Sequence, residues 1–186
     1  DDLNAVRAVR DLLPNDVHLM SDFNQSLSAD EALKRCSALD DEGLYWIEEP
    51  IRHDDFVRCA ELTAKTTTPI QIGENLRSEL EFDQAIRANA ANFYMPDVQR
   101  IGGVSGWLRA AALAEKHQLK LSSHLFPEIS VHLLAASKTN HWLEYVDWAN
   151  PILEEPLTIS EGIASCPDKP GHGMKWDEDA IKRYQG

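Results

Sequence analysis

The chain has 186 residues, 43% of them hydrophobic, and carries a formal net charge of −13 at pH 7. This length and composition allow a sizeable core in one or two domains, whereas the acidity argues against a nucleic-acid partner and against an anionic membrane surface. No apolar run approaches the roughly 18 residues that a membrane-spanning helix needs, and three scattered cysteines without a C-x-x-C pair predict a reducing, cytoplasmic setting rather than a disulfide framework or a zinc site.

The first residues already follow a helical pattern. In DDLNAVRAVRDLL, apolar side chains recur at Leu3, Val6, Val9 and Leu13, which is the spacing of one helix face. A domain that opens inside such a pattern is expected to lack its beginning.

Short apolar strands then alternate with helices along the chain. The strands are predicted at residues 17–23, 44–49, 69–74, 91–97, 119–124 and 141–146, and the helices between them at residues 29–42, 54–66, 79–89, 103–118 and 127–137. Two capping boxes, Ser28 with Glu31 and Ser78 with Glu81, support the helix starts. Pro127 is well placed at the first position of the last of these helices.

This alternation predicts an α/β protein with a parallel sheet covered by helices, either a (β/α) barrel or a doubly wound sheet. An ionisable residue lies at or near the carboxyl end of every predicted strand, in the order Asp22, Glu48, Glu74, Asp97, His124 and Glu144. The barrel is favoured because it gathers all strand ends on one face, whereas a doubly wound sheet concentrates its site at one switch point. We expect residues 1–150 to form the barrel portion and the proline- and glycine-rich residues 151–186 to lie outside the repeat.

Three acids end successive predicted strands: Asp22, Glu48 and Glu74. Mg²⁺ prefers oxygen ligands, and three acids brought together without a cation would suffer mutual repulsion and loss of hydration. Each acid taken alone would more simply cap a helix or join a surface ion pair. Three of them at matched strand ends favour a metal site.

His124 is a candidate general base. Asp97 ends the preceding strand, and a carboxylate beside an imidazole fixes the tautomer of the ring and raises its basicity. Without Asp97, a structural histidine would be the simpler interpretation. Glu144 is a candidate neutral acid that donates a hydrogen bond to developing charge, with a plain surface acid as the alternative.

A second metal hypothesis comes from the stretch LSSHLFPEISVH, in which His124, Glu128 and His132 recur every four residues. The hypothesis is weak because Pro127 begins the helix and leaves His124 outside it. Only Glu128 and His132 share a helical face, and we expect them to form a local hydrogen-bonded pair.

Six segments, taken together and in order, resemble the mandelate racemase group of the enolase superfamily, the mandelate racemase/muconate lactonizing enzyme family: SDFNQSL, WIEEP, IGEN, MPDVQRIGGVSGW, SSHLFPEISVHLLAA and HWLE. The resemblance implies that Asp22, Glu48 and Glu74 bind an essential Mg²⁺, or Mn²⁺ in its place. It also implies that Asn24 is a nearby polar group that helps to bind the substrate.

The same resemblance implies that His124 and Asp97 are the acid–base dyad of the family and that Glu144 hydrogen-bonds the substrate carboxylate. The implied reaction is Mg²⁺-dependent removal of the proton next to a carboxylate through a stabilised enediolate, as in racemisation of a 2-hydroxy acid. A cation would also explain how an acidic protein binds a small anionic carboxylate. The resemblance further implies a homo-oligomer, an octamer being one such assembly.

The chain departs from the family pattern at its start. The family fold is a (β/α)7β barrel of the TIM type preceded by a small α+β capping domain, and this chain matches only about the last six strands. A second base of the family, the lysine of a K-x-K strand, would lie before Asp1, and no K-x-K occurs in the sequence. We expect a C-terminal portion of a longer protein, in which residues 151–186 pack back toward the capping domain, and little activity if the rest is absent.

Other functions share part of this pattern. An acid-sugar dehydratase would use the same ligands and the same dyad on the same scaffold. A non-catalytic barrel that serves as a scaffold or oligomer subunit would need none of the polar strand ends. A metallohydrolase barrel would require histidines among the metal ligands, and the candidate ligands here are all acids.

Overall fold

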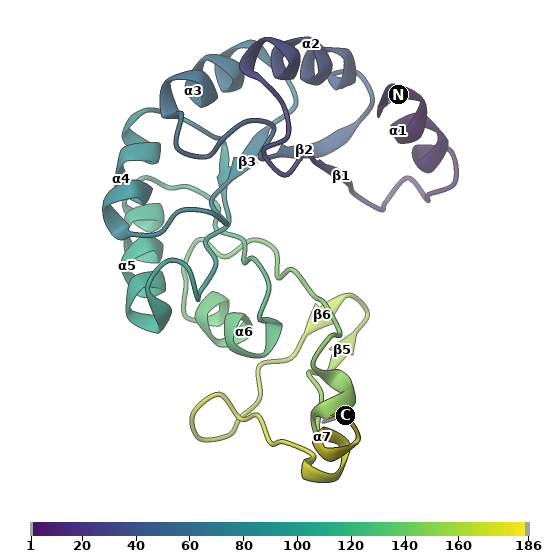
Figure 1. The fold of residues 1–186 in the computed structure, drawn as a ribbon, viewed down its shortest axis with the longest axis vertical. Helices are drawn as coiled ribbons and strands as arrows, with labels where there is room; N and C mark the ends of the chain where they lie inside the picture. The colour runs from purple at the N-terminus through teal and green to yellow at the C-terminus, as the bar shows by residue number, and fades with distance from the viewer. Residues whose placement is uncertain (1, 185–186) are drawn as a thin grey trace. The chain divides into compact units, whose positions relative to one another are not determined.

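The computed structural model describes residues 2–184 and divides into two compact units, the first ending at Met95 and the second beginning at Pro96. The first unit contains a parallel sheet with its helices, and the second contains two longer helices, a small hairpin and a C-terminal helix (Figure 1).

The first unit is built on a four-stranded parallel sheet in the order β1-β2-β3-β4. The strands β1 to β4 are Leu19–Asp22, Leu44–Glu48, Ile70–Ile72 and Phe93–Tyr94, and the helices α1 to α4 are Asp2–Arg10, Ala29–Leu39, Phe56–Lys65 and Glu79–Arg87. Helices α2, α3 and α4 each connect two neighbouring strands and lie along one side of the sheet (Figure 1). This arrangement confirms the predicted alternation for the first four strands.

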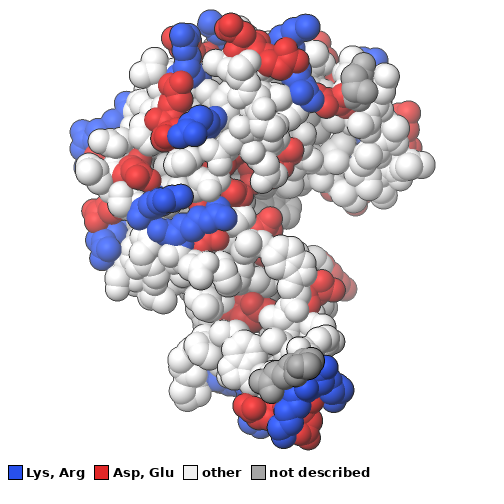
Figure 2. Space-filling model, viewed as in Figure 1, with Lys and Arg blue, Asp and Glu red and all other residues white. Residues whose placement is uncertain are grey.

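Burial accounts for the apolar character of the strands. Ile47, Ile70 and Ile72 in the central strands are fully buried, and the helices contribute Leu39 and Phe82 to the same core. A parallel sheet covered by helices therefore reads as short apolar runs rather than as an alternating pattern. The outward helix faces carry Lys and Arg interspersed with Asp and Glu (Figure 2).

Both predicted N-caps are confirmed. Ser28 Oγ accepts a hydrogen bond from the Glu31 amide at 3.3 Å, and Ser78 Oγ accepts one from the Glu81 amide at 3.2 Å. The second capping box is incomplete, because the Glu81 carboxylate accepts from the Arg77 amide at 2.7 Å instead of from Ser78. Each cap satisfies one of the amides that a helix leaves unpaired at its start.

The second unit contains α5, α6, the 3₁₀ helix η1, the antiparallel hairpin β5–β6 and α7. Their bounds are Gly103–Lys116, Pro127–Ala135, Asn150–Ile152, Ile159–Ser160 with Ile163–Ala164, and Glu178–Tyr184. Pro127 begins α6 as predicted. The segment after residue 150 contains the hairpin β5–β6 and ends in a helix that the sequence pattern did not reveal.

The prediction of continuous strands at residues 119–124 and 141–146 is wrong. The structure forms only isolated parallel bridges there, between Leu121 and Asn140 and between Asp97 and His124.

A shift in register explains the interruption. The Leu121 amide donates to the Thr139 carbonyl and the His141 amide donates to the Leu121 carbonyl, both at 2.9 Å. The bond after these, from the Ser123 amide at 2.9 Å, reaches the Trp142 carbonyl. That acceptor lies one residue beyond the position that an evenly spaced parallel ladder requires. The Glu144 amide then donates to the Ser123 hydroxyl at 3.1 Å instead of to a backbone carbonyl. Side-chain and backbone acceptors thus replace the regular ladder that defines a strand.

None of the helices between residues 2 and 184 combines the length and the apolar character that a membrane span requires.

Candidate active site

The three candidate metal ligands lie at the carboxyl ends of β1, β2 and β3 in the first unit. Asp22 and Glu48 are the last residues of their strands and are partners in the parallel register. Glu74 follows the end of β3 by two residues. Glu48 and Glu74 are buried, whereas Asp22 is exposed. All three acids therefore lie at the carboxyl-terminal ends of neighbouring strands, at the same end of the sheet.

Glu48 is the most strongly perturbed of these acids. Its Oε2 accepts hydrogen bonds from Trp46 Nε1 and Gln71 Nε2, both at 3.1 Å. Burial, and after it the negative charge of Asp22, raise the pKa of Glu48 to about 8; the bond from Gln71 opposes this rise, and the charge of Glu74 adds to it. A cation bound beside this carboxyl would favour its ionisation, because the positive charge would offset the repulsion from the two other acids.

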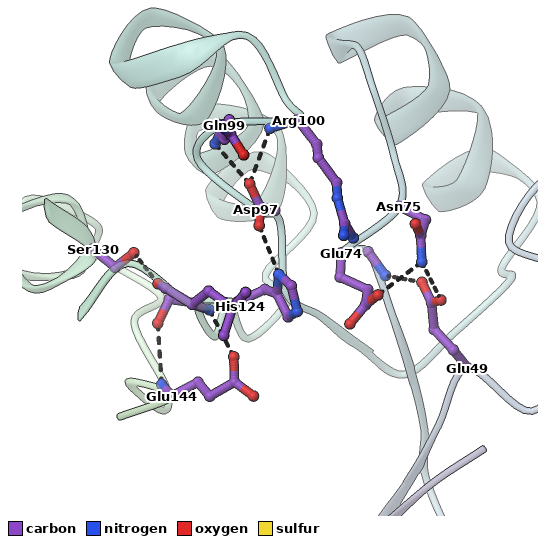
Figure 3. A network of polar contacts seen from close by, with 12 residues as sticks. Glu49, Glu74, Asn75, Asp97, Gln99, Arg100, His124, Ser130 and Glu144 are labelled. Atoms are coloured by element: carbon purple, nitrogen blue, oxygen red, sulfur yellow. Dashed lines mark hydrogen bonds and ion pairs between the residues drawn. The ribbon is translucent and has the colours of Figure 1, made fainter. Parts of the chain in front are cut away.

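Glu49 and Asn75 form hydrogen bonds beside the candidate ligands, and no role was predicted for them from the sequence. Glu49 is fully buried. Asn75 Nδ2 donates to Glu49 Oε2 at 2.7 Å and to Glu74 Oε1 at 2.9 Å, so that one amide links the two acids (Figure 3). Burial raises the pKa of Glu49 to about 7 against the lowering effect of the bond from Asn75. A signal was available, because each residue directly follows a candidate ligand in the chain.

Asn24 contacts Asp22 directly. Its amide donates to Asp22 Oδ1 at 2.7 Å, and its side-chain amide donates to Asp22 Oδ2. Asn24 and Gln25 both have left-handed backbones, with φ of 46° and 60°, and this turn brings the Asn24 side chain back to the end of β1. The structure thus makes Asn24 a neighbour of the candidate ligand, and its contact with a substrate stays a prediction.

The donor set fits a hard cation, although the acids do not form a closed cage. Within residues 2–184, no three His, Cys, Asp or Glu side chains already converge closely enough to hold a metal ion. Mg²⁺ needs only a few protein carboxylates because it retains water or substrate in its other positions. Three acids on one sheet edge, two of them buried and mutually repelling, have that chemistry.

His124 and Asp97 are in contact in the second unit, and their role as an acid–base dyad stays a prediction. His124 Nδ1 lies 2.7 Å from Asp97 Oδ2 (Figure 3), and the two residues also form a backbone bridge. Asp97 Oδ1 accepts from the amides of Gln99 at 2.7 Å and Arg100 at 3.0 Å. Burial works to raise the pKa of Asp97, but the bond from His124 and the two amides together hold that pKa below its usual value. The ionised carboxylate therefore orients the ring with Nδ1–H toward itself, and Nε2 is left to accept a proton.

Glu144 is tied to the turn that follows His124. Its Oε2 accepts from the Leu125 amide at 2.6 Å. Leu125 and Phe126 have φ of 49° and 47°, a conformation that costs on the order of 1–3 kcal/mol for each such residue. Fully buried Ser130 donates from Oγ to the Leu125 carbonyl at 2.8 Å and so stabilises the turn (Figure 3). Sequence reasoning missed Ser130, because no residue pattern marks a left-handed turn made of two bulky side chains.

The expected hydrogen-bonded pair of Glu128 and His132 is wrong. His132 Nδ1 lies 3.1 Å from Cys166 Sγ, and His132 Nε2 lies 3.1 Å from the His172 carbonyl. Glu128 is buried, and its Oε1 has no hydrogen-bond partner within the described residues. Both ring nitrogens of His132 thus contact the C-terminal segment, which the spacing on one helix face could not predict.

Known proteins of related sequence include a dehydratase and a cycloisomerase. L-talarate/galactarate dehydratase of Salmonella typhimurium is 37% identical over 100% of this chain and 46% of its own length, and 3,6-anhydro-alpha-L-galactonate cycloisomerase of Streptomyces coelicolor is 34% identical over 98% and 51%. The chain thus spans about half the length of these curated relatives.

Solved structures give the same result. An enolase of alpha proteobacterium BAL199 with bound magnesium matches with a TM-score of 0.94 and 46% identity, and an enolase of Bradyrhizobium with magnesium and mandelic acid matches with 0.92 and 40%. Each match covers 98% of this chain and 50% of the other. The predicted fold class, an α/β chain of the enolase-type parallel barrel, is confirmed. The family model described as "Enolase C-terminal domain-like" matches residues 1–180, and the chain belongs to that family.

Proposed function

We propose that this chain carries the metal ligands and one base of an enzyme that removes the proton next to the carboxylate of a small 2-hydroxy acid. The observation that supports this best is the 2.7 Å contact between His124 Nδ1 and the buried Asp97 carboxylate. This contact is the arrangement that prepares an imidazole to act as a base.

The metal would be held by Asp22, Glu48 and Glu74. When bound, Mg²⁺ supplies positive charge that offsets the second negative charge developing on the substrate. The magnesium in the structures of the BAL199 and Bradyrhizobium enolases supports this assignment. Mn²⁺ has the same preference for oxygen ligands and would serve in its place.

Three side chains would handle the substrate itself. His124 Nε2 takes the proton, and Asp97 stabilises the imidazolium that results. Glu144 would hydrogen-bond the substrate carboxylate as that group becomes an enediolate. Asn24 would bind a polar group of the substrate.

Racemisation of a 2-hydroxy acid is the first candidate reaction, and the mandelic acid bound to the Bradyrhizobium enolase supports a substrate of this kind. Dehydration of an acid sugar is the second candidate. The relatives named L-talarate/galactarate dehydratase and D-gluconate dehydratase, the latter 28% identical, support it. Both reactions begin with the same proton abstraction, and they differ in whether a proton returns or a β-hydroxyl leaves.

Deuterium exchange tests the shared first step. The full-length natural protein is incubated with Mg²⁺ and with mandelate, galactarate or gluconate in ²H₂O, and deuterium at the α-carbon is measured by NMR. We expect exchange with at least one acid, and a fall of about 100-fold or more in His124→Asn. His117→Asn, at an exposed histidine after α5, is the matched control and should exchange normally.

The products then separate the two reactions, because a racemase inverts the carbon whereas a dehydratase forms a 2-keto acid. Calorimetric titration with Mg²⁺ adds a readout that is independent of turnover, and Glu48→Gln should abolish binding. A protein with neither Mg²⁺ binding nor exchange would be a non-catalytic scaffold, and the proposal would be lost.

A further inference from the structure

The three thiols of the chain differ sharply in their surroundings. All three cysteines are free, and Cys36 and Cys59 are buried. Burial raises the pKa of each of these two thiols to about 12, which makes them poor nucleophiles because the thiolate is the reactive form. Cys166 is exposed. Only Cys166 among these thiols is open to reagents in solution.

Cys166 is paired with an oriented imidazole. Its Sγ lies 3.1 Å from His132 Nδ1, and the opposite ring nitrogen, Nε2, lies 3.1 Å from the His172 carbonyl. A carbonyl only accepts hydrogen bonds, so the proton of the neutral ring is on Nε2 and Nδ1 accepts from the thiol. Nucleophile, base and a third group that orients the base are the elements of an activated thiol.

The thiol also opens onto an apolar groove in the same unit. The groove has a volume of about 410 Å³, and Cys166 lines it together with Val131, Leu134, Trp142, Tyr145 and Ile163. It lies between α6, the segment around residue 142 and the β5–β6 hairpin. Lys, Arg, Asp and Glu are absent from the described groove lining. Asn140 and His141 contribute polar side chains to the lining. Because the rest of the lining is mostly apolar, the groove favours an uncharged organic molecule, whereas a charged one would lose much of its hydration.

We propose that Cys166 and His132 form a covalent modification site for small uncharged electrophiles of the α,β-unsaturated carbonyl class. The Cys166 S–H proton passes to His132 Nδ1, and the thiolate sulfur forms a bond to the β-carbon while the electrons of the carbon–carbon double bond move to the α-carbon. The proton is then returned from His132 to that α-carbon. The addition balances without an oxidant, a reductant or a leaving group, and it is independent of the proposed Mg²⁺-dependent reaction.

Maleimides, which are uncharged unsaturated carbonyl compounds, test the proposal on the full-length natural protein at near-neutral pH. The protein is treated with N-ethylmaleimide, and adducts at the three thiols of this chain are located and followed by peptide mapping. Among these thiols we expect an adduct only at Cys166, formed about 10-fold faster than with free N-acetylcysteine. His132→Gln should lower the rate by about 10-fold or more, whereas His117→Gln should leave it unchanged. Cys166→Ser should abolish the adduct.

N-phenylmaleimide tests the groove. Its rate relative to N-ethylmaleimide should be at least about threefold higher at Cys166 than at N-acetylcysteine, because the ring gains apolar contact there. Labelling of folded chain at Cys36 or Cys59 before Cys166, or a Cys166 rate no higher than that of N-acetylcysteine, would overturn the proposal. The comparison with N-acetylcysteine uses the unaltered chain and therefore decides the matter even if His132→Gln fails to fold. A folded His132→Gln chain that reacts at the original rate would remove His132 from the site.

Discussion

At the scale of single residues, the candidate metal ligands of the first unit repel one another when no cation is bound. Glu48 is 8% exposed and is paired in register with Asp22. The rise of its pKa to about 8 means that this carboxyl keeps its proton at neutral pH in the metal-free chain. Metal binding must then release that proton, so we infer that affinity for Mg²⁺ increases with pH up to about this value.

Stability of the metal-free chain should depend on pH through the same residue. Glu48 keeps its proton in the folded state up to about pH 8 but ionises near its ordinary value of 4.5 in the unfolded state. The unfolded state binds fewer protons between these values, so the free energy of unfolding falls as the pH rises through this window. We expect a loss on the order of 5 kcal/mol from Glu48, measured by urea denaturation with EDTA present.

Two glutamine variants separate Glu48 from the other acids. Glu48→Gln should remove most of the loss of stability with pH, and the smaller part that remains belongs to Glu49, whose pKa burial raises to about 7. Glu31→Gln changes an exposed glutamate of α2 and should leave the loss intact. An unchanged pH slope in Glu48→Gln would show that the proton is held elsewhere.

At the scale of elements, the turn after β3 depends on a glycine. Gly73 has φ of 141°, and a Cβ at this position would lie 2.8 Å from the Met95 backbone nitrogen. The close approach allows the chain just after β4 to pass against the turn that carries Glu74. The position of Glu74 therefore depends on Gly73, the residue before it, having no side chain.

We expect Gly73→Ala to lower the free energy of unfolding by about 3 kcal/mol, because it adds both backbone strain and a backbone clash. Gly43→Ala is the matched control. Gly43 also has a positive φ, 69°, but its added Cβ would meet nothing within 4 Å, so the expected loss is about 1 kcal/mol. Chemical denaturation measures both variants, and equal losses would show that the contact with Met95 relaxes freely.

At the scale of the whole molecule, a net charge of −13 destabilises the compact state through self-repulsion. The surface mixes both signs on its helix faces (Figure 2), so part of this repulsion is offset locally. Asp22 and Glu74 concentrate negative charge at the carboxyl end of the sheet. A divalent cation bound there would reduce their repulsion and would stabilise the folded chain.

Mg²⁺ should therefore raise the melting temperature of the chain. A ligand at 100 times its dissociation constant adds about 2.7 kcal/mol, which corresponds to roughly 5–10 °C for a chain of this size. Differential scanning fluorimetry measures the shift, with NaCl at equal ionic strength as the control for general screening. Glu48→Gln should show only the shift that NaCl produces; a full Mg²⁺ shift in that variant would contradict the assigned ligands.

Local chemistry explains why much of the first unit was predictable. The strands can be predicted because they are short apolar runs in the sequence. Ser28 and Ser78 mark helix starts because their hydroxyls accept hydrogen bonds from nearby amides. The contact of His124 with Asp97 was predictable too. Although residues 119–124 form no continuous strand, the chain still returns through α5 to place the two residues side by side in a parallel bridge. The names of the relatives agree with the chemistry inferred from these residues at the level of the superfamily.

The sequence by itself determined the order of the first four strands and their helices, the family and the acids at or just after the ends of the first three strands, because these follow from short-range patterns that repeat along the chain. Only the tertiary structure decided the register shift after Leu121, the support of Glu74 by Asn75, and the pairing of His132 with Cys166. Each of these depends on which acceptor lies nearest when distant segments pack. Spacing along one helix face could not reveal that the partner of His132 is a thiol 34 residues further along the chain.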